Sequence, residues 1–427
     1  MKWRRLLSSL VFAVLLIGAV VKCADLLEYK EAREKYTPFY ESETNFDVIF
    51  LGTSHMWNHV LPMEMWKDYG IASYNWGYSN CTPAENYYLI QDILKYTSPK
   101  VVVLDTFGLV EYDCWNNGKY RSDCIEQQHV QFDSLPVWSL NKFKAARDVF
   151  DDYEDNRDFV WNFLMYHNRW TELGERDFDY QYTTEKGSCF LTGLGEGWFN
   201  DIGEEEKCEI DSVCYPYYLK IIEYCQEQGI PVLCTYLPYG SPGEENQRIA
   251  NTIGDIVEQY PNCSYVNMLT KEIPDYNTDV YPDSIHLNYS GALKTTAWLG
   301  AWLKDHYELE DYSDNASWIE AYHDYVAYKQ ETLQSLTVLA DYLVQLKDDD
   351  FTAEVEVYDR RLADSELFGE LLQNAEIMPR VTEKETDACA RIIVRNSRTG
   401  EQVEDACFAF EDPETVSVYA RKIGAEE

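Results

Sequence analysis

Positive charge is scarce in this sequence. The chain has 36 Lys and Arg against 75 Asp and Glu, which gives a formal net charge of -39 over 427 residues. No basic stripe follows the first few residues, which argues against nucleic acid as a partner, because its phosphates are bound by clustered Lys and Arg. An acidic surface also repels anionic lipids and polyanionic polymers, except where a groove is locally neutral.

Metal-binding patterns are also missing. The 7 His and 12 Cys residues do not form paired Cys-x-x-Cys motifs or His clusters with the spacing of a zinc site. We therefore expect no metal and no cofactor. If the chain is exported, disulfides are permitted, and two cysteine pairs are close enough in sequence to close small loops: Cys114 with Cys124, and Cys208 with Cys214.

Long apolar runs are absent except at the N-terminus. A positive cluster at positions 2–5 precedes an apolar stretch over residues 6–21, the layout of a signal sequence. The stretch is short for a transmembrane helix, which needs about 20 residues, but Trp3 and Lys22 could extend it by anchoring at the two interfaces. No small-x-small cleavage site follows. We predict an uncleaved, single-pass signal anchor over residues 1–22 with the remainder outside the cytoplasm; secretion after cleavage is the alternative.

Downstream, short apolar runs alternate with longer amphipathic segments. The apolar runs predict buried strands at residues 47–52, 72–74, 100–105, 230–238 and 264–268. The amphipathic segments predict helices over residues 83–96, 211–229, 243–260 and 288–306. This alternation predicts an α/β fold, a parallel sheet flanked by helices on both faces. Ligand sites in such folds lie at the carboxyl ends of the strands.

The alternation defines one domain over residues 45–310 with other segments around it. Residues 112–210, rich in Asp, Asn, Trp and Tyr, interrupt it and are expected to be an insertion that covers or extends the site. Residues 311–349 are expected to form one long helix. Residues 350–427 contain stretches that alternate apolar and polar side chains, the period of half-buried strands, and predict a small C-terminal β-rich module.

The first candidate for chemistry is Ser54, which follows the strand at 47–52 through the turn Gly52-Thr53. A Ser at such a turn projects its hydroxyl above the sheet, where a base can reach it. A serine in this position more often caps a helix, so the signal is weak when taken alone.

The second candidate is Asp283-Ser-Ile-His286, in a loop before the last helix of the same domain. An Asp and a His three residues apart can share a hydrogen bond that fixes the imidazole in one tautomer. His286 could then take the proton of Ser54 and return it to a leaving group. Together the two motifs are far more specific than either one.

These motifs resemble those of the SGNH (GDSL-like) hydrolase family. The family's first block corresponds to Gly52-Thr53-Ser54, its last block to Asp283-Ser-Ile-His286, and its second block contributes a glycine matched by Gly77 in Asn75-Trp-Gly77. The resemblance covers roughly residues 45–306. It implies a flavodoxin-like SGNH fold with Ser54 as nucleophile and Asp283 and His286 completing a catalytic triad.

The resemblance also implies an oxyanion hole, with departures from the family pattern. Backbone N–H groups of Ser54 and Gly77 would be donors. The family's third block supplies an Asn side chain, but the matching segment here reads Leu-Asp-Thr-Phe-Gly, so Asn80 or Thr106 would have to substitute. His55 replaces the usual Leu and either binds substrate, packs, or faces solvent.

A further element places the chain near one branch of that family. Tyr166-His167-Asn-Arg169-Trp170 resembles an aromatic-His-x-Arg-Trp element of a membrane-anchored branch that includes alginate O-acetylation proteins and the D-alanine-transfer protein of teichoic acid synthesis. The resemblance implies that His167, Arg169 and Trp170 bind substrate. Arg169 would clamp a carboxylate or phosphate and Trp170 would stack on a sugar. An arginine–aromatic packing pair is the alternative.

The sequence thus predicts a serine esterase or O-acyltransferase that acts on a cell-surface polysaccharide or cell-wall polymer. A membrane acyl-donor protein is a further expected partner. The alternative is a surface protein of the same fold with weak or no catalysis, serving polymer binding or export. The missing third-block Asn and the extra β-rich module motivate that alternative. A phosphodiesterase or metal hydrolase ranks lower because the sequence offers no metal-ligand cluster.

Overall fold

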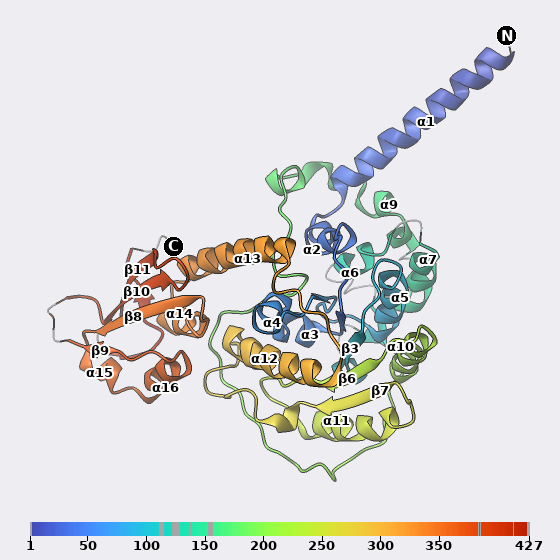
Figure 1. Ribbon diagram of the computed structural model, residues 1–427. Helices are drawn as coiled ribbons and strands as arrows, with labels where there is room; N and C mark the ends of the chain where they lie inside the picture. The colour runs from blue at the N-terminus through green and yellow to red at the C-terminus, as the bar shows by residue number, and fades with distance from the viewer. Residues whose placement is uncertain are drawn as a thin grey trace.

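A computed structural model describes residues 2–110, 115–121, 129–136, 139–152, 157–382, 384, 386–412 and 414–424. Its central sheet has five parallel strands in the order β2-β1-β3-β6-β7 (Figure 1). The strands are β1 (Val48–Leu51), β2 (Ser73–Asn75), β3 (Val101–Asp105), β6 (Val232–Tyr236) and β7 (Cys263–Asn267). Counted along the chain, this is the 2-1-3-4-5 order of flavodoxin-like folds. The predicted α/β fold class is confirmed.

Helices connect these strands and cover both faces of the sheet. They are α3 (Ser54–His59), α4 (Pro62–Tyr69), α5 (Pro83–Ile93), α10 (Tyr215–Glu227), α11 (Glu244–Val257) and α12 (Tyr289–His306). The α3, α4 and α12 helices share one apolar layer with the sheet, and α5, α10 and α11 share the other. Short 3-10 turns, η1 (Phe107–Leu109) and η6 (Leu269–Lys271), follow β3 and β7.

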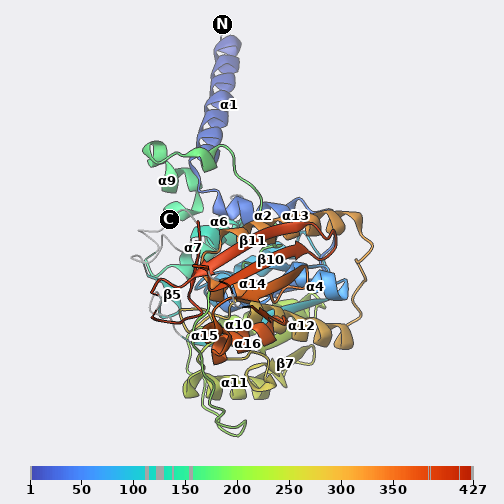
Figure 2. The same cartoon turned by 90° about the vertical axis from the view of Figure 1, so that its left-hand side faces the viewer.

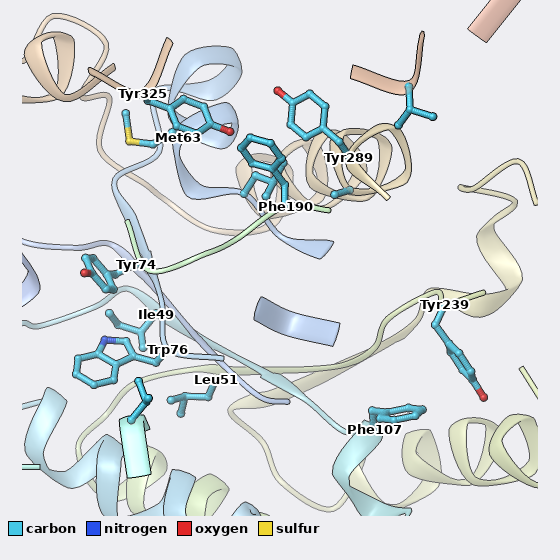
Figure 3. Packing of buried hydrophobic residues seen from close by; sticks show 14 of the residues in the cluster. Ile49, Leu51, Met63, Tyr74, Trp76, Phe107, Phe190, Tyr239, Tyr289 and Tyr325 are labelled. Carbon is cyan, nitrogen blue, oxygen red and sulfur yellow. The ribbon is translucent and has the colours of Figure 1, made fainter. Parts of the chain in front are cut away.

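The core forms because successive side chains of a strand point to opposite faces. In β1, Val48 and Phe50 enter the layer under α3, α4 and α12, while Ile49 and Leu51 enter the opposite layer. Figure 3 shows Ile49 and Leu51 beside Trp76, which follows β2. All of these side chains are buried, and each contributes about 1.5–3 kcal/mol of stabilisation by leaving water. The central strands are therefore rigid supports for residues at their ends.

The N-terminal helix α1 (Lys2–Leu27) projects away from the body (Figures 1 and 2). The stretch Trp3–Leu27 is long and apolar enough to cross a membrane; its 18-residue apolar window has a mean hydropathy of 2.4 and contains no buried residue, whereas Leu27 at the end of the helix is buried. This matches the predicted apolar segment, although the helix continues five residues beyond position 22. A signal anchor and a cleaved signal sequence both fit these properties. Helix α2 (Glu31–Tyr40) then leads into β1.

The segment between β3 and α10 contains only short elements among its described residues. They are β4 (Trp115–Asn116), β5 (Lys119–Tyr120), α6 (His129–Asp133), α7 (Leu140–Val149), η3 (Arg157–Val160), α9 (Asn162–Tyr166), η4 (Arg169–Thr171) and η5 (Glu175–Asp177). The disulfide considered between Cys208 and Cys214 is not formed, because Cys208 is free. The backbone of Cys208 is held on α11 through the hydroxyl of Thr252. Cys114 and Cys124 lie outside the described residues.

The prediction of one long helix over residues 311–349 is wrong. The chain forms α13 (Ala316–Ser335) and α14 (Leu339–Gln345), separated by an extended break. Thr337 and Val338 in this break pair with the C-terminal strand: Lys422 N–H donates to the Thr337 carbonyl at 2.8 Å, and Val338 bridges Arg421. β-branched residues suit that extended backbone better than a helix. A tertiary strand contact thus interrupts the local helical pattern.

The C-terminal region forms a second sheet, which faces the viewer in Figure 2. Its strands are β8 (Phe351–Val357), β9 (Arg380–Val381), β10 (Ala390–Asn396), β11 (Gln402–Ala409) and β12 (Arg421–Lys422), in the order β12-β11-β10-β8-β9. Helices α15 (Arg360–Ala363) and α16 (Glu366–Asn374) pack beside it. The sheet is mixed, since only β8 and β9 pair in parallel. The predicted small β-rich module is confirmed.

A buried cluster of charges, which we call the clasp, joins this module to the α/β domain. The Lys329 ammonium of α13 lies 2.7 Å from a Glu64 oxygen of α4 and 2.6 Å from oxygens of both Asp348 and Asp350. Burial alone raises the pKa of Glu64, but Lys329 and Lys67 outweigh it and hold that pKa at about 2. The three carboxylates lie close enough together to bind a cation, and the ammonium of Lys329 is that cation.

Candidate active site

Ser54 lies at the carboxyl end of β1, beside the point where strand order reverses between β1 and β3. It is the first residue of α3 and is 7% exposed. The turn before it requires glycine, because a side chain on Gly52 would lie 2.6 Å from the Cβ of Asp105 and 2.9 Å from that of Met56. Thr53 donates its hydroxyl proton to Asp105 at 3.2 Å. The two strands β1 and β3 thus fix the position of the serine together.

Asp105 is completely buried at the end of β3, beneath this turn. Burial raises the pKa of its carboxyl to about 7, although hydrogen bonds from the Phe107 backbone and from Thr53 lower it in part. The Phe107 N–H and the Thr53 hydroxyl are held by the two different oxygens of this one carboxyl group. Asp105 therefore acts as a brace between the nucleophile turn and the start of η1.

The loop that carries Asp283 and His286 is a closed, hydrogen-bonded turn. Its stem is the antiparallel bridge between Val280 and Leu287, and the Tyr281 N–H donates to the His286 carbonyl at 2.9 Å. Ser284 turns the chain with a left-handed φ of 58°. These contacts present the side chains at positions 283 and 286 on the same side of the turn.

Asn288 fixes the junction between this loop and α12. Its side chain donates to the Thr278 carbonyl at 2.9 Å and accepts from the Gly291 N–H at 3.3 Å as the cap of α12. Asn288 is therefore the N-cap of α12. The loop is tied at its base to both the preceding chain and the following helix.

The structure brings Ser54, His286 and Asp283 into one continuous chain of hydrogen bonds. His286 Nε2 lies 2.8 Å from Ser54 Oγ, and His286 Nδ1 lies 2.6 Å from Asp283 Oδ2. Ser54 is 232 positions away from His286 in sequence. Both distances lie within the range for proton transfer between a nucleophile, a base and its orienting group.

The charge on Asp283 is strongly favoured. Partial burial raises its pKa, but the hydrogen bonds from the His286 ring and from the backbone N–H groups of His286 and Ile285 outweigh this and hold the pKa at about 2. The two backbone donors both lie 2.9 Å from Oδ1, which leaves Oδ2 for the imidazole. Asp283 is therefore a fixed anion that orients the Nδ1–H of His286 toward itself and leaves Nε2 free to accept.

Two further histidines of α3 surround the triad. His55 is fully buried and stacks on His59, with the ring of Phe107 3.7 Å away and that of Tyr239 5.0 Å away. The labelled Phe107 and Tyr239 lie close together in Figure 3. Burial lowers the pKa of His55 well below its usual value, so its ring is neutral, and neither ring nitrogen has a hydrogen-bond partner among the described residues. Full burial favours the packing interpretation of His55 over contact with solvent.

His59 connects the nucleophile helix to the base loop. Its Nε2 accepts the N–H of Leu287 at 2.9 Å, and its ring lies 5.9 Å from that of His286. Burial lowers its pKa well below the usual value, which keeps the ring neutral and Nε2 available as an acceptor. The sequence analysis missed His59. The signal was its spacing of four residues from His55, which places both rings on one side of α3.

The oxyanion donors expected at Gly77 and Thr106 are engaged elsewhere. The Gly77 N–H donates to the side-chain oxygen of Asn75 at 2.8 Å, and the Thr106 hydroxyl donates to the Thr235 carbonyl at 2.9 Å. Asn75 was also missed as a structural residue: its amide nitrogen donates to the carbonyl of Met56 within α3 and to that of Val60, which caps the helix.

The other two expected donors have different outcomes. For Asn80 the structure shows a left-handed backbone whose carbonyl accepts from Trp115, with no side-chain contact to the triad among the described residues. The backbone N–H of Ser54 donates to no other group in the described chain. Of the four expected oxyanion donors, it is therefore the one that lies at the nucleophile and is free to donate to a substrate.

The residues of the insertion that were expected to bind substrate lie elsewhere. Arg169 donates to the Leu27 carbonyl at 2.5 Å, and its guanidinium lies 3.6 Å from the ring centre of Tyr29. The alternative of an arginine–aromatic packing pair therefore holds for Arg169. His167 contacts the Leu164 carbonyl, and Trp170 is exposed. Among the described residues the structure shows no contact from these three side chains to the triad.

A different part of the insertion reaches the site. The extended stretch before residue 200 runs along the base loop: the Gly195 N–H donates to the Val280 carbonyl at 2.8 Å, and the Tyr289 N–H donates to Leu191 at 2.5 Å. A side chain on Gly195 would lie 2.4 Å from the Tyr281 carbonyl, so only glycine permits this approach. This stretch of the insertion therefore lies against the loop that carries Asp283 and His286; that the insertion covers or extends the site stays a prediction.

Comparisons with known proteins give only remote likenesses. No protein-family model matches the chain, and no curated protein matches it. A solved structure from Streptococcus pneumonia, provisionally described as a platelet activating factor, is 12% identical with a TM-score of 0.32 and covers 69% of this chain and 99% of its own. An acylhydrolase, provisionally so described, from Bacteroides fragilis is 12% identical with a TM-score of 0.30, covering 64% and 95%.

A third solved structure is a gut microbial diltiazem-metabolizing enzyme. It is 14% identical with a TM-score of 0.21 and covers 62% of this chain and 47% of its own. At these identities and TM-scores, none of the three structures carries an argument about function. The case for activity rests on the geometry of the site.

Proposed function

We propose that this chain is a membrane-anchored serine esterase or O-acyltransferase of the SGNH type, acting on a cell-surface polysaccharide or cell-wall polymer. The observation that carries the proposal is the chain of contacts from Ser54 Oγ through the His286 ring to Asp283, at 2.8 and 2.6 Å. A serine hydroxyl activated in this way forms an acyl-enzyme with an ester substrate.

The proposed reaction has two halves. His286 Nε2 accepts the proton of Ser54 as Oγ attacks the ester carbonyl carbon, and Asp283 stabilises the resulting imidazolium. The N–H of Ser54 donates to the oxyanion, and collapse of the tetrahedral intermediate expels the alcohol, which takes the proton from His286. In the second half, water or a sugar hydroxyl loses its proton to His286 and attacks the acyl carbonyl carbon; the bond to Ser54 Oγ then breaks, and Oγ takes the proton back from His286. Water gives hydrolysis, and a sugar hydroxyl gives transfer.

The test is Ser54→Ala in the full chain, purified in detergent and assayed with p-nitrophenyl acetate and a fluorophosphonate probe. We expect ester turnover to fall by at least a factor of about 1,000, because the nucleophile is lost, and labelling to disappear. Ser335→Ala is the matched control, since its hydroxyl is exposed on α13. Equal turnover by wild type and Ser54→Ala would show that the triad assignment is wrong.

A second function is favoured by the engagement of the Gly77 N–H and the Thr106 hydroxyl. With two of the expected oxyanion donors used within the fold, the chain would be a polymer-binding or export protein with weak catalysis. Loss of one donor alone typically costs a factor of about 100–1,000. Absence of fluorophosphonate labelling of wild type, together with retained binding to a cell-wall glycan, would favour this second function.

A further inference from the structure

Four apolar side chains of the insertion gather at the base of α1. They are Trp161, Leu164, Trp170 and Phe178, which are 41, 40, 53 and 68% exposed, and we call them the collar. A group of large exposed apolar side chains at one place on a strongly acidic chain is typical of a surface that contacts a membrane or another partner. None of the four contacts the triad among the described residues.

The contacts of the insertion place the collar beside the end of α1. Trp161 lines a cavity of about 400 Å³ together with Val21 and Ala24 of that helix. Arg169, directly before Trp170, binds the Leu27 carbonyl, and it pairs with Asp177, directly before Phe178. Figures 1 and 2 show α9, which contains Leu164, next to the base of α1 from two directions.

The length of α1 sets the height of the collar relative to a bilayer. About 20 residues at about 1.5 Å each span the hydrocarbon core of about 30 Å, so a core that begins at Trp3 ends near Lys22. Lys22 is 84% exposed in its side chain and suits that boundary. Leu27 lies five residues further, which is about 7–8 Å and corresponds to the layer of lipid headgroups.

We propose that the collar is a membrane-contact surface that rests in the headgroup layer of the bilayer spanned by α1 and holds the catalytic domain in one orientation. This rests on the membrane anchor of the proposed function. Tryptophan favours this layer because its ring is apolar while the indole N–H can remain hydrated, and phenylalanine and leucine insert their apolar side chains at the boundary between headgroups and acyl chains.

Trp161 of the collar lines the same cavity as Val21 and Ala24 of α1, so the collar adjoins the apolar helix, and this identifies lipid as the occupant. No residue in the apolar window of α1 is buried by the protein, and lipid is the solvent that covers a projecting apolar helix of this length. Electrostatic attraction is not the driving force, because the chain has a net charge of -39. The contact is therefore expected on zwitterionic lipid and at high salt.

The experiment reconstitutes the full chain, one copy per nanodisc, in phosphatidylcholine with or without brominated acyl chains, and measures the tryptophan fluorescence lost to bromine. We expect Trp161→Phe/Trp170→Phe to lower the quenched fluorescence about threefold, since Trp3 remains as the one lipid-exposed indole. Trp198→Phe is the control: Trp198 is 51% exposed but lies beside Gly240, and its loss should leave the quenched amount unchanged.

The outcomes separate the collar from the anchor. If Trp3→Phe reduces quenching but the double variant does not, the anchor is inserted and the collar inference is overturned. If Trp3→Phe also has no effect, the anchor itself is wrong. Raising the salt from 0.1 to 1 M should leave the collar-dependent quenching intact; its loss would contradict an apolar contact. Circular dichroism and the Trp170→Phe single variant check that the fold survives.

Discussion

The orienting role of Asp283 leads to a sharp prediction for Asp283→Asn. In this variant the side-chain oxygen can still accept the two backbone N–H groups that lie 2.9 Å from Oδ1. The amide NH2 replaces Oδ2, which lies 2.6 Å from His286 Nδ1. An NH2 group cannot accept the Nδ1–H, so the ring shifts to the tautomer that carries its proton on Nε2. Nε2 then faces Ser54 as a donor and cannot act as a base.

We expect kcat to fall by about 10,000-fold, which corresponds to about 5.5 kcal/mol of lost transition-state stabilisation at 1.36 kcal/mol per factor of ten. Because the turn keeps its backbone contacts, the variant should still fold, and its melting temperature at pH 7 should fall only by the part of the stability that the Asp283 charge contributes. The matched control is Asp275→Asn, eight positions earlier, whose carboxylate holds the Asn277 N–H at 3.0 Å in a similar turn but touches no triad residue in the described chain. It should retain wild-type turnover.

The assay is p-nitrophenyl acetate turnover from pH 5 to 9 in detergent. A loss of less than tenfold in Asp283→Asn, or equal losses in the two variants, would refute the orientation argument. A second readout is stability in acid. The pKa of Asp283 is depressed to about 2 from an ordinary 3.8, so its contribution is present above pH 4 and is lost as the pH falls toward 2. The variant should lack this part of the acid dependence.

Two other predictions concern positioning and stability. Replacing His59 with Phe removes the acceptor of the Leu287 N–H and should displace the loop that carries His286, so we expect kcat to fall by about 100-fold with little change in KM. His59→Gln, which keeps an acceptor, should restore part of kcat. A change in KM alone would contradict this positioning role. Lys329→Met leaves three buried carboxylates without their central cation and should lower the free energy of unfolding in urea at pH 7 by about 3–5 kcal/mol. Lys347→Met breaks an exposed ion pair with Glu376 and should lower the same free energy by less than about 1 kcal/mol. Equal effects of the two lysine variants would show that the clasp is not a buried network.

The sequence predicted the sheet and the triad because both leave local signals. Five apolar runs of strand length between amphipathic segments are sufficient to predict a doubly covered parallel sheet. Ser54 and His286 could be paired because each falls at the carboxyl end of a predicted strand or before a predicted helix. Parallel topology brings such positions to one edge of the sheet. The 2.8 Å contact between them follows from that topology.

The errors have a different origin, since they concern contacts that no local pattern encodes. For Arg169 the motif left substrate binding and packing on an aromatic ring both open, and its contacts are with the Leu27 carbonyl at the end of the N-terminal helix and with the ring of Tyr29. The Gly77 N–H was expected to face the nucleophile, but the neighbouring Asn75 side chain takes it. The single helix expected near position 337 is broken by pairing with the last strand. Each outcome depends on which distant segment arrives at that place.

The clasp has a consequence for anyone who trims this protein. Asp350 belongs to the C-terminal region, while Glu64 and Lys329 belong to helices that pack on the catalytic layer. A fragment cut before position 348 would keep the buried ammonium of Lys329 but lose the carboxylates of Asp348 and Asp350. Glu64 would then be the one carboxylate of the clasp left to balance that charge. The C-terminal module therefore cannot be removed without disrupting the clasp. A minimal fragment has to extend at least through the turn that leads into β8 and include enough of the second sheet to exclude water from that turn.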